Sequence, residues 1–176
     1  MLPLISGEEE KLETEYRKIL GALPASGVGP IAPAAFPLTA MVHRVLVRDG
    51  HCLAVSLALA SPASAADVAA VLRGWAPSDA RVRALPSAPP AYIAVRDEAD
   101  RPQPLLDRDA GRGFTTVVGR VRACALNTVK LFVVSHNTVM GAAGSSILNA
   151  ELAHAMALLP PQTAAARSAA AAAARA

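Results

Sequence analysis

The sequence has few aromatic residues, few cysteines and little net charge. Aromatic side chains make up 3% of its 176 residues, and the formal net charge of +3 is not gathered into a basic stripe, which argues against a nucleic-acid-binding surface. The two cysteines, Cys52 and Cys124, provide neither a disulfide framework nor a metal-ligand spacing, and they indicate a reducing compartment. We therefore predict no metal site and no nucleic-acid partner.

The sequence also lacks a segment typical of a membrane span or a secretory signal. The uncharged run 19–42 contains four prolines, which are incompatible with a regular helix. The uncharged run 131–150 carries too many polar and glycine positions for a lipid-facing surface. No basic region precedes the glutamates that begin at Glu8. We expect a cytoplasmic protein with no membrane partner.

The first sixty residues predict a helix followed by a β-hairpin. Ser6 and Glu9 form a capping-box pattern in front of a helix over 8–20. After a proline- and glycine-rich connection, two apolar runs at 41–48 and 53–59 have strand character. The dipeptide Asp49-Gly50 between these runs is typical of a two-residue hairpin turn.

The remaining pattern completes an α+β domain. It predicts a helix from about 62 to 75, strands at 92–96, 114–122 and 129–134, and a final helix at 141–159. The order αββαβββα favours a largely antiparallel, mixed sheet with helices on one face. An apolar second face of that sheet would suit a second subunit, so we predict a homo-oligomer. Residues 1–160 form the predicted domain, and 161–176 form an alanine-rich, frayed tail.

The stretch 135–152 is the most informative part of the sequence. It passes from an apolar run through the polar corner Ser135-His136-Asn137 into a helix that opens with small residues, a pattern that allows close approach to the backbone. This stretch is one of four blocks that together resemble, in order, the C-terminal substrate-binding and dimerisation domain of aspartate-semialdehyde dehydrogenases of the archaeal and fungal type. The other blocks are Ser6–Lys11 with Lys18–Gly21, His43–Val45 through Asp49–His51, and Arg101–Gly111, with Val118–Arg120 preceding the stretch 135–152.

The resemblance implies an activity and also a missing part. The family interconverts aspartyl phosphate and aspartate semialdehyde, with NADP as the cofactor, and uses a cysteine nucleophile in an Asn-Cys context. Neither cysteine here has that context, and no G-x-G-x-x-G motif for a dinucleotide is present. We therefore predict that this chain supplies one wall of an active site and that it is inactive without an N-terminal half.

Five residues match positions that have roles in the family. By resemblance, His51 is the catalytic base, Arg44 holds the substrate carboxylate, Glu8 meets the substrate amino group, Lys11 contacts phosphate and Asn137 lies near the nicotinamide. Each residue type suits its role, because histidine can exchange a proton near neutral pH and a guanidinium grips a carboxylate with two hydrogen bonds. Met140 stands where the family usually has an arginine.

Alternatives remain for these residues and for the chain. His51 can be a solvated histidine, Arg44 a charge on a strand surface, Asn137 a helix cap, and Glu8 with Lys11 a charged first turn. A tight hairpin would place Arg44 on the same sheet face as His51, about 13 Å along the strand. The chain can be one part of a split enzyme, a non-enzymatic dimerisation module or a remnant without a role.

Overall fold

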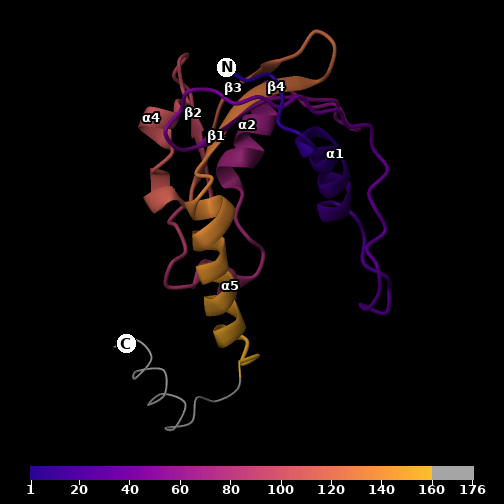
Figure 1. The fold of residues 1–176 in the computed structure, drawn as a ribbon, viewed down its shortest axis with the longest axis vertical. Coiled ribbons are helices and arrows are strands. Elements are labelled where there is room, and N and C mark those ends of the chain that lie inside the picture. Colours follow the sequence, from indigo (N-terminus) through magenta and orange to yellow (C-terminus); the bar gives the residue numbers. More distant parts are fainter. Residues whose placement is uncertain (160–176) are drawn as a thin grey trace. The chain divides into compact units, whose positions relative to one another are not determined.

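The computed structural model describes residues 1–159, and the predicted alanine-rich tail lies outside them. The chain divides into two compact units, Met1–Arg48 and Asp49–Ala176. Figure 1 traces the elements of both units along the chain. No helix among the described residues is long and apolar enough to cross a membrane.

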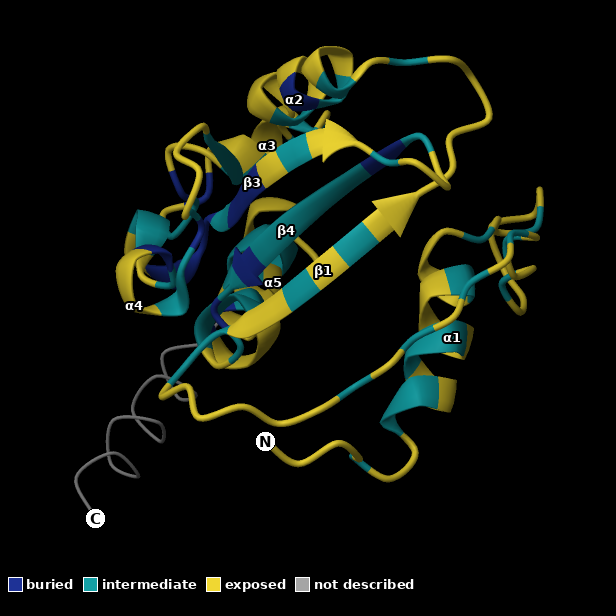
Figure 2. Ribbon diagram, turned by 90° about the horizontal axis from the view of Figure 1, so that it is seen from above, coloured by how far each residue is buried: buried dark blue, intermediate teal, exposed yellow. Residues whose placement is uncertain are grey.

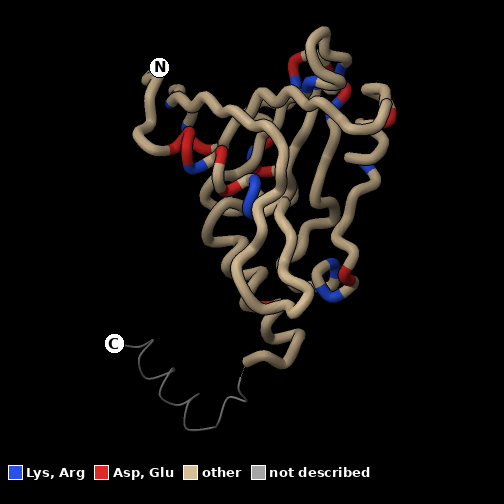
Figure 3. The backbone as a smooth tube through the Cα atoms, turned by 90° about the vertical axis from the view of Figure 1, so that its right-hand side faces the viewer, with Lys and Arg blue, Asp and Glu red and all other residues tan. Residues whose placement is uncertain are grey.

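The unit Met1–Arg48 is built around one acidic helix, α1 (Glu8–Ile19). Figure 3 shows several acidic residues close together on this helix near the N-terminus. Three glutamates occupy its first turn, and Arg17 and Lys18 occupy its last turn, which is the charge order that the helix dipole favours. The predicted capping box at Ser6 is wrong: the helix begins after Gly7, which has φ 74° and caps through its backbone geometry alone.

The segment after α1 returns along that helix instead of forming a strand. Oε1 of Glu13 accepts a hydrogen bond from the Ala40 amide (2.8 Å), and Oε1 of Glu9 accepts one from the Val42 amide (2.9 Å). Since Glu9 and Glu13 are one helical turn apart, they lie on the same face of α1. They satisfy backbone donors that a sheet would otherwise pair.

The unit that begins at Asp49 contains a four-stranded sheet in the order β1-β4-β3-β2. The strands are β1 (His51–Leu57), β2 (Ile93–Arg96), β3 (Thr116–Ala123) and β4 (Val129–Ser135). β4 pairs antiparallel with both β1 and β3, whereas β2 and β3 are parallel. The predicted fold class, α+β with a mixed and largely antiparallel sheet, is confirmed.

The hairpin predicted at Asp49-Gly50 is wrong. No strand forms at 41–48, where only Arg44 makes an isolated bridge, to Leu2. Strand β1 pairs with β4 instead, with His51 opposite Ser135. The predicted element order αββαβββα therefore loses its first strand, and the hairpin argument that placed Arg44 on the same sheet face as His51 no longer applies.

Helices and short turns complete this unit. α2 (Ala65–Gly74) begins with a capping box formed by Ser64 and Asp67 and packs on β2 and β3. Further short elements are α3 (Ala80–Arg83), α4 (Pro104–Asp107) and η1 (Ala110–Gly113). The predicted last helix divides into a π-helical turn, η2 (Val139–Ala143), and α5 (Gly144–Ala155).

The core of the sheet lies on its two central strands, as Figure 2 shows by the buried residues of β3 and β4 and the exposed positions along β1. Val117, Val129 and Val134 are fully buried. A Cβ added at Gly144 would lie 2.7 Å from the Phe114 ring, so this glycine is required for the close packing of α5. The rest of the small-residue run, Gly141–Ala143, is exposed.

Candidate functional site

The predicted site residues fall into two groups, one in each unit. Glu8, Lys11 and Arg44 belong to the unit Met1–Arg48, whereas His51 and Asn137 belong to the unit that begins at Asp49.

The first group gathers at the N-terminal turn of α1. Glu8 and Lys11 form an ion pair of 3.6 Å between Oε1 and Nζ, and both side chains are partly exposed. Arg44 exchanges two backbone hydrogen bonds with Leu2, of 3.0 and 2.9 Å, and its side chain is exposed. Because Glu9 binds the Val42 amide, the segment that carries Arg44 is tethered to the helical turn that carries Glu8 and Lys11. The sequence did not predict this tether, because a glutamate in an acidic first turn is usually solvated.

The second group forms where β1 begins and β4 ends. His51 is exposed and is the first residue of β1, and its register partner Ser135 is the last residue of β4. Two residues beyond Ser135, the Oδ1 atom of Asn137 accepts a hydrogen bond of 2.9 Å from the amide of Gly50. The structure therefore brings together the predicted base and the predicted cofactor contact.

A buried histidine lies beside this second group. His136 is 8% exposed, and its Nδ1 atom accepts a hydrogen bond of 3.3 Å from the amide of Val139, at the start of η2. Its Nε2 atom lies 3.7 Å from the Asp109 carboxylate. These contacts show that His136 fixes the backbone next to Asn137.

The Arg101–Gly111 block surrounds a buried carboxylate. Asp107 is 1% exposed and accepts hydrogen bonds from Nε and Nη2 of Arg101 (2.7 and 2.5 Å), from the Gln103 amide (2.7 Å) and from Nε of Arg96 (3.3 Å). Burial alone would raise the pKa of the Asp107 carboxyl, but the hydrogen bonds from Arg101 and Gln103 hold it below its ordinary value. A Cβ added at Gly119 would lie 2.5 Å from the Arg101 carbonyl oxygen, so β3 needs glycine where this block crosses it.

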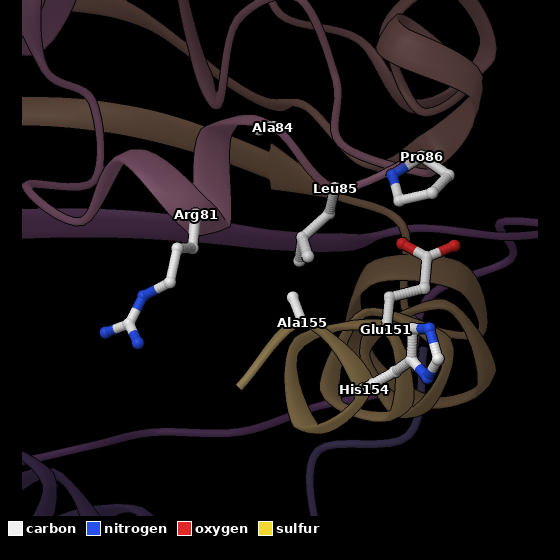
Figure 4. A pocket seen from close by; sticks show the side chains of 7 residues that line it. All are labelled: Arg81, Ala84, Leu85, Pro86, Glu151, His154 and Ala155. Carbon is white, nitrogen blue, oxygen red and sulfur yellow. The ribbon is translucent and has the colours of Figure 1, made fainter. Parts of the chain in front are cut away.

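A hollow in the second unit lies apart from the predicted residues. It has a volume of about 250 Å³ between α3 and α5 (Figure 4). Its charged groups are already engaged, because Glu151 accepts hydrogen bonds from Ser87 and Arg81 is paired with Asp79. None of the five predicted site residues lines it. The lining residues are Arg81, Ala84, Leu85, Pro86, Glu151, His154 and Ala155.

The two cysteines differ in chemistry. Hydrogen bonding from Ser56, with the backbone amides of Asn127 and Leu126, lowers the pKa of the Cys124 thiol to about 7. Desolvation raises the pKa of Cys52. No group of acidic, histidine and cysteine side chains within residues 1–159 has the arrangement of a metal site.

We expect iodoacetamide to alkylate Cys124 at least roughly fivefold faster than Cys52 at pH 7, because the thiolate is the reacting species. Mass spectrometry of tryptic peptides over a time course would measure both rates. Ser56→Ala should slow the reaction of Cys124 and leave Cys52 unchanged. Equal rates for the two thiols would show that the Ser56 contact does not form.

Comparison with known proteins now identifies the domain. The family described as "Semialdehyde dehydrogenase, dimerisation domain" matches residues 1–140. The chain is 47% identical over 158 residues to aspartate-semialdehyde dehydrogenase of Aspergillus fumigatus, covering 87% of this chain and 43% of that protein. The corresponding enzyme of Archaeoglobus fulgidus is 44% identical over 152 residues, which cover 86% of this chain and 42% of that protein.

A solved structure agrees with these relatives. Aspartate-semialdehyde dehydrogenase from Candida albicans, crystallised with NADP, superposes with a TM-score of 0.81 at 43% identity, covering 90% of this chain and 45% of that one. The fold is therefore that of an α+β domain of a dehydrogenase. The chain belongs to the semialdehyde dehydrogenase family, in which it corresponds to the dimerisation domain, and it spans less than half the length of these relatives.

Proposed function

We propose that this chain is the C-terminal part of an NADP-dependent aspartate-semialdehyde dehydrogenase and completes its active site. The observation that carries the proposal is the 0.81 TM-score with the Candida albicans enzyme at 43% identity. In this proposal the nucleophilic cysteine and the dinucleotide-binding fold come from outside the residues of this chain. The reaction interconverts aspartyl phosphate and aspartate semialdehyde.

The proposed roles follow from the two groups of residues. Arg44 holds the substrate carboxylate and Glu8 meets its amino group, while Lys11 faces the phosphate. Glu8 and Lys11 neutralise each other in the described structure, so a substrate that carries both an ammonium and an anionic group can replace each partner with an opposite charge.

His51 is proposed to move the proton, since it is exposed at the end of β1 and histidine exchanges protons near neutral pH. Asn137 is proposed to meet the nicotinamide end of NADP, which supplies or accepts hydride when bound. The residues of this chain fit only the nicotinamide end of the cofactor. The amide nitrogen of Asn137 makes no hydrogen bond among the described residues. The sequence contains no glycine-rich turn that could bind the pyrophosphate.

Complementation tests the proposal. The purified chain alone should show no NADP reduction with aspartate semialdehyde and phosphate, because it lacks the nucleophile. Addition of a separately expressed N-terminal half of a relative should restore turnover that depends on both chains. Activity of this chain alone, or no activity with any such half under conditions where the two chains bind, would contradict the proposal.

A second candidate is a non-enzymatic dimerisation module. The matched family is itself described as a dimerisation domain, and the apolar side chains of Leu131, Phe132 and Val133 on β4 remain partly exposed. We expect light scattering to give the mass of a dimer at micromolar concentration. A dimer without complementation would favour this candidate, whereas a strict monomer would count against it.

A further inference from the structure

We propose that Glu9 and Glu13 are positioning residues for the substrate-binding group of the first unit. Their carboxylates hold the segment 40–44 in one register along α1, and this register places Arg44 at the helix end that is proposed to bind the substrate. The inference rests on the proposed function and deepens it, because it assigns a role in substrate binding to two side chains that do not touch the substrate.

Glu9 and Glu13 differ from Glu10, the next glutamate of the acidic first turn. Both are half-buried, and Oε1 of each accepts a backbone hydrogen bond, from the Val42 amide at 2.9 Å and from the Ala40 amide at 2.8 Å, respectively. Glu10 is exposed, and its side chain has no hydrogen bond or ion pair among the described residues. The two contacts therefore belong to one face of α1 and are not a general property of its acidic residues.

The spacing of the two contacts fits an extended chain that runs antiparallel to the helix. Glu9 and Glu13 lie about 6 Å apart along the helix axis, at about 1.5 Å per residue. The two amides that they bind are about 6.5 Å apart in an extended chain, at about 3.3 Å per residue. Two residues further on, the amide of Arg44 lies on the same edge of the segment and donates a hydrogen bond of 2.9 Å to the Leu2 carbonyl. Arg44 thus lies about one helical turn beyond Glu9, toward the N-terminal end of α1.

Within residues 1–159, the two carboxylates are the only hydrogen-bonded link between the segment 40–44 and a regular element. The other hydrogen bonds of the segment are the two that Arg44 exchanges with Leu2. Leu2 is 61% exposed and lies in the irregular stretch before α1, so this bridge joins two irregular stretches and does not set the register by itself. A slip of one residue would move Arg44 by about 3.3 Å and turn its side chain to the other side of the segment.

The register of the segment matters for substrate binding and not for proton transfer. In the proposed function one end of the substrate meets Arg44 while its ammonium meets Glu8, so these two side chains must stand at one separation. Loss of the register should therefore weaken binding and raise KM. The proton transfer assigned to His51 should change little.

Amide exchange in the full chain tests the positioning without any enzyme activity. In the double variant Glu9→Ala/Glu13→Ala, we expect the Arg44 amide proton to exchange with water at least about tenfold faster, as measured by nuclear magnetic resonance. This amide is bonded to Leu2 and not to a glutamate, so its exchange reports the register of the segment. The amides of α1 should keep their protection, because alanine favours a helix. An Arg44 amide that stays as protected as in the unsubstituted chain would overturn the proposal.

Two control variants separate the contacts from the charge. Glu9→Gln/Glu13→Gln removes both charges but keeps the acceptor oxygens, so the Arg44 amide should remain protected. Glu10→Ala removes a charge from the same helical turn without touching the segment, and it should leave the exchange of the Arg44 amide unchanged. Equal acceleration by Glu10→Ala and by the double alanine variant would also overturn the proposal.

Kinetics of the enzyme formed with an N-terminal half tests the role in binding. The double alanine variant should raise the KM for aspartate semialdehyde at least about fivefold and leave kcat within about twofold, and the double glutamine variant should restore KM. Faster exchange of the Arg44 amide with an unchanged KM would overturn the role in substrate binding. Failure of complementation by the unsubstituted chain, with the exchange results as expected, would refute the proposed function and still support the positioning of Arg44.

Discussion

Replacing Asp107 by alanine is expected to lower the free energy of unfolding by about 3–5 kcal/mol, because removing one partner of a buried ion pair leaves the other charges uncompensated. The carboxylate is 1% exposed and receives four hydrogen bonds, three of them from arginine side chains. Urea unfolding followed by the single tryptophan, Trp75, which lies against Tyr92, would measure the change.

Two variants separate charge from shape in this prediction. Asp107→Asn keeps the volume and can still accept from the Gln103 amide, so it should lose only part of the stability. Asp97→Ala is the surface control, because Asp97 also pairs with an arginine, Arg73, but its side chain is 84% exposed, and such pairs contribute little. Equal effects of Asp107→Ala and Asp97→Ala would show that the Asp107 cluster is not buried in solution.

Because of the Asp107 carboxylate, we also expect the free energy of unfolding to depend on pH in the acid range. Its pKa is depressed in the folded state, so its contribution to stability is present above the unfolded value of about 3.9 and is lost as the pH falls through the lower folded value. In the Asp107→Asn variant, this part of the acid destabilisation should be missing. The comparison needs unfolding curves for both proteins between neutral pH and the acid range.

The sequence predicted the parts of the fold that depend on local patterns. Val129–Val134 and the first half of β3 are apolar runs that become the central strands, where Val117, Val118, Val129 and Val134 are buried. The acidic start of α1 agrees with its dipole. The hairpin prediction was wrong because the dipeptide Asp49-Gly50 indicates a residue with positive φ, which Gly50 does adopt. The dipeptide does not indicate which strands pair. Val45, Leu46 and Val47 stay exposed, and β1 finds its partner in β4, far along the chain.

In the candidate site, too, the sequence predicted a contact between near neighbours and missed the contacts between distant residues. Glu8 and Lys11 came together through helical spacing, and the structure pairs them. The contact between Gly50 and Asn137 spans 87 positions, and no local pattern indicates which distant amide an asparagine will bind. The tether from Glu9 to Val42 was equally hidden, because a glutamate in an acidic first turn is usually solvated.

Replacing His51 by alanine is expected to reduce kcat by about 10²–10⁴-fold in the enzyme formed with an N-terminal half, the usual contribution of a positioned acid–base group. The KM for aspartate semialdehyde should change little, because the proposed carboxylate and ammonium contacts belong to Arg44 and Glu8. This pattern, a loss in kcat and kcat/KM together, is that of an interaction used in the transition state. Steady-state kinetics of NADP reduction would measure it.

The matched control is His154→Ala, because His154 is also exposed, belongs to the same unit and lies on α5 beside the hollow of Figure 4. That change should leave kcat within about twofold. Arg44→Ala should affect KM more than kcat, the reverse of His51→Ala, because a lost carboxylate contact weakens substrate binding. If His51→Ala keeps full kcat while Arg44→Ala raises KM, the chain binds substrate through the proposed contacts, but the proton is moved by a group outside it.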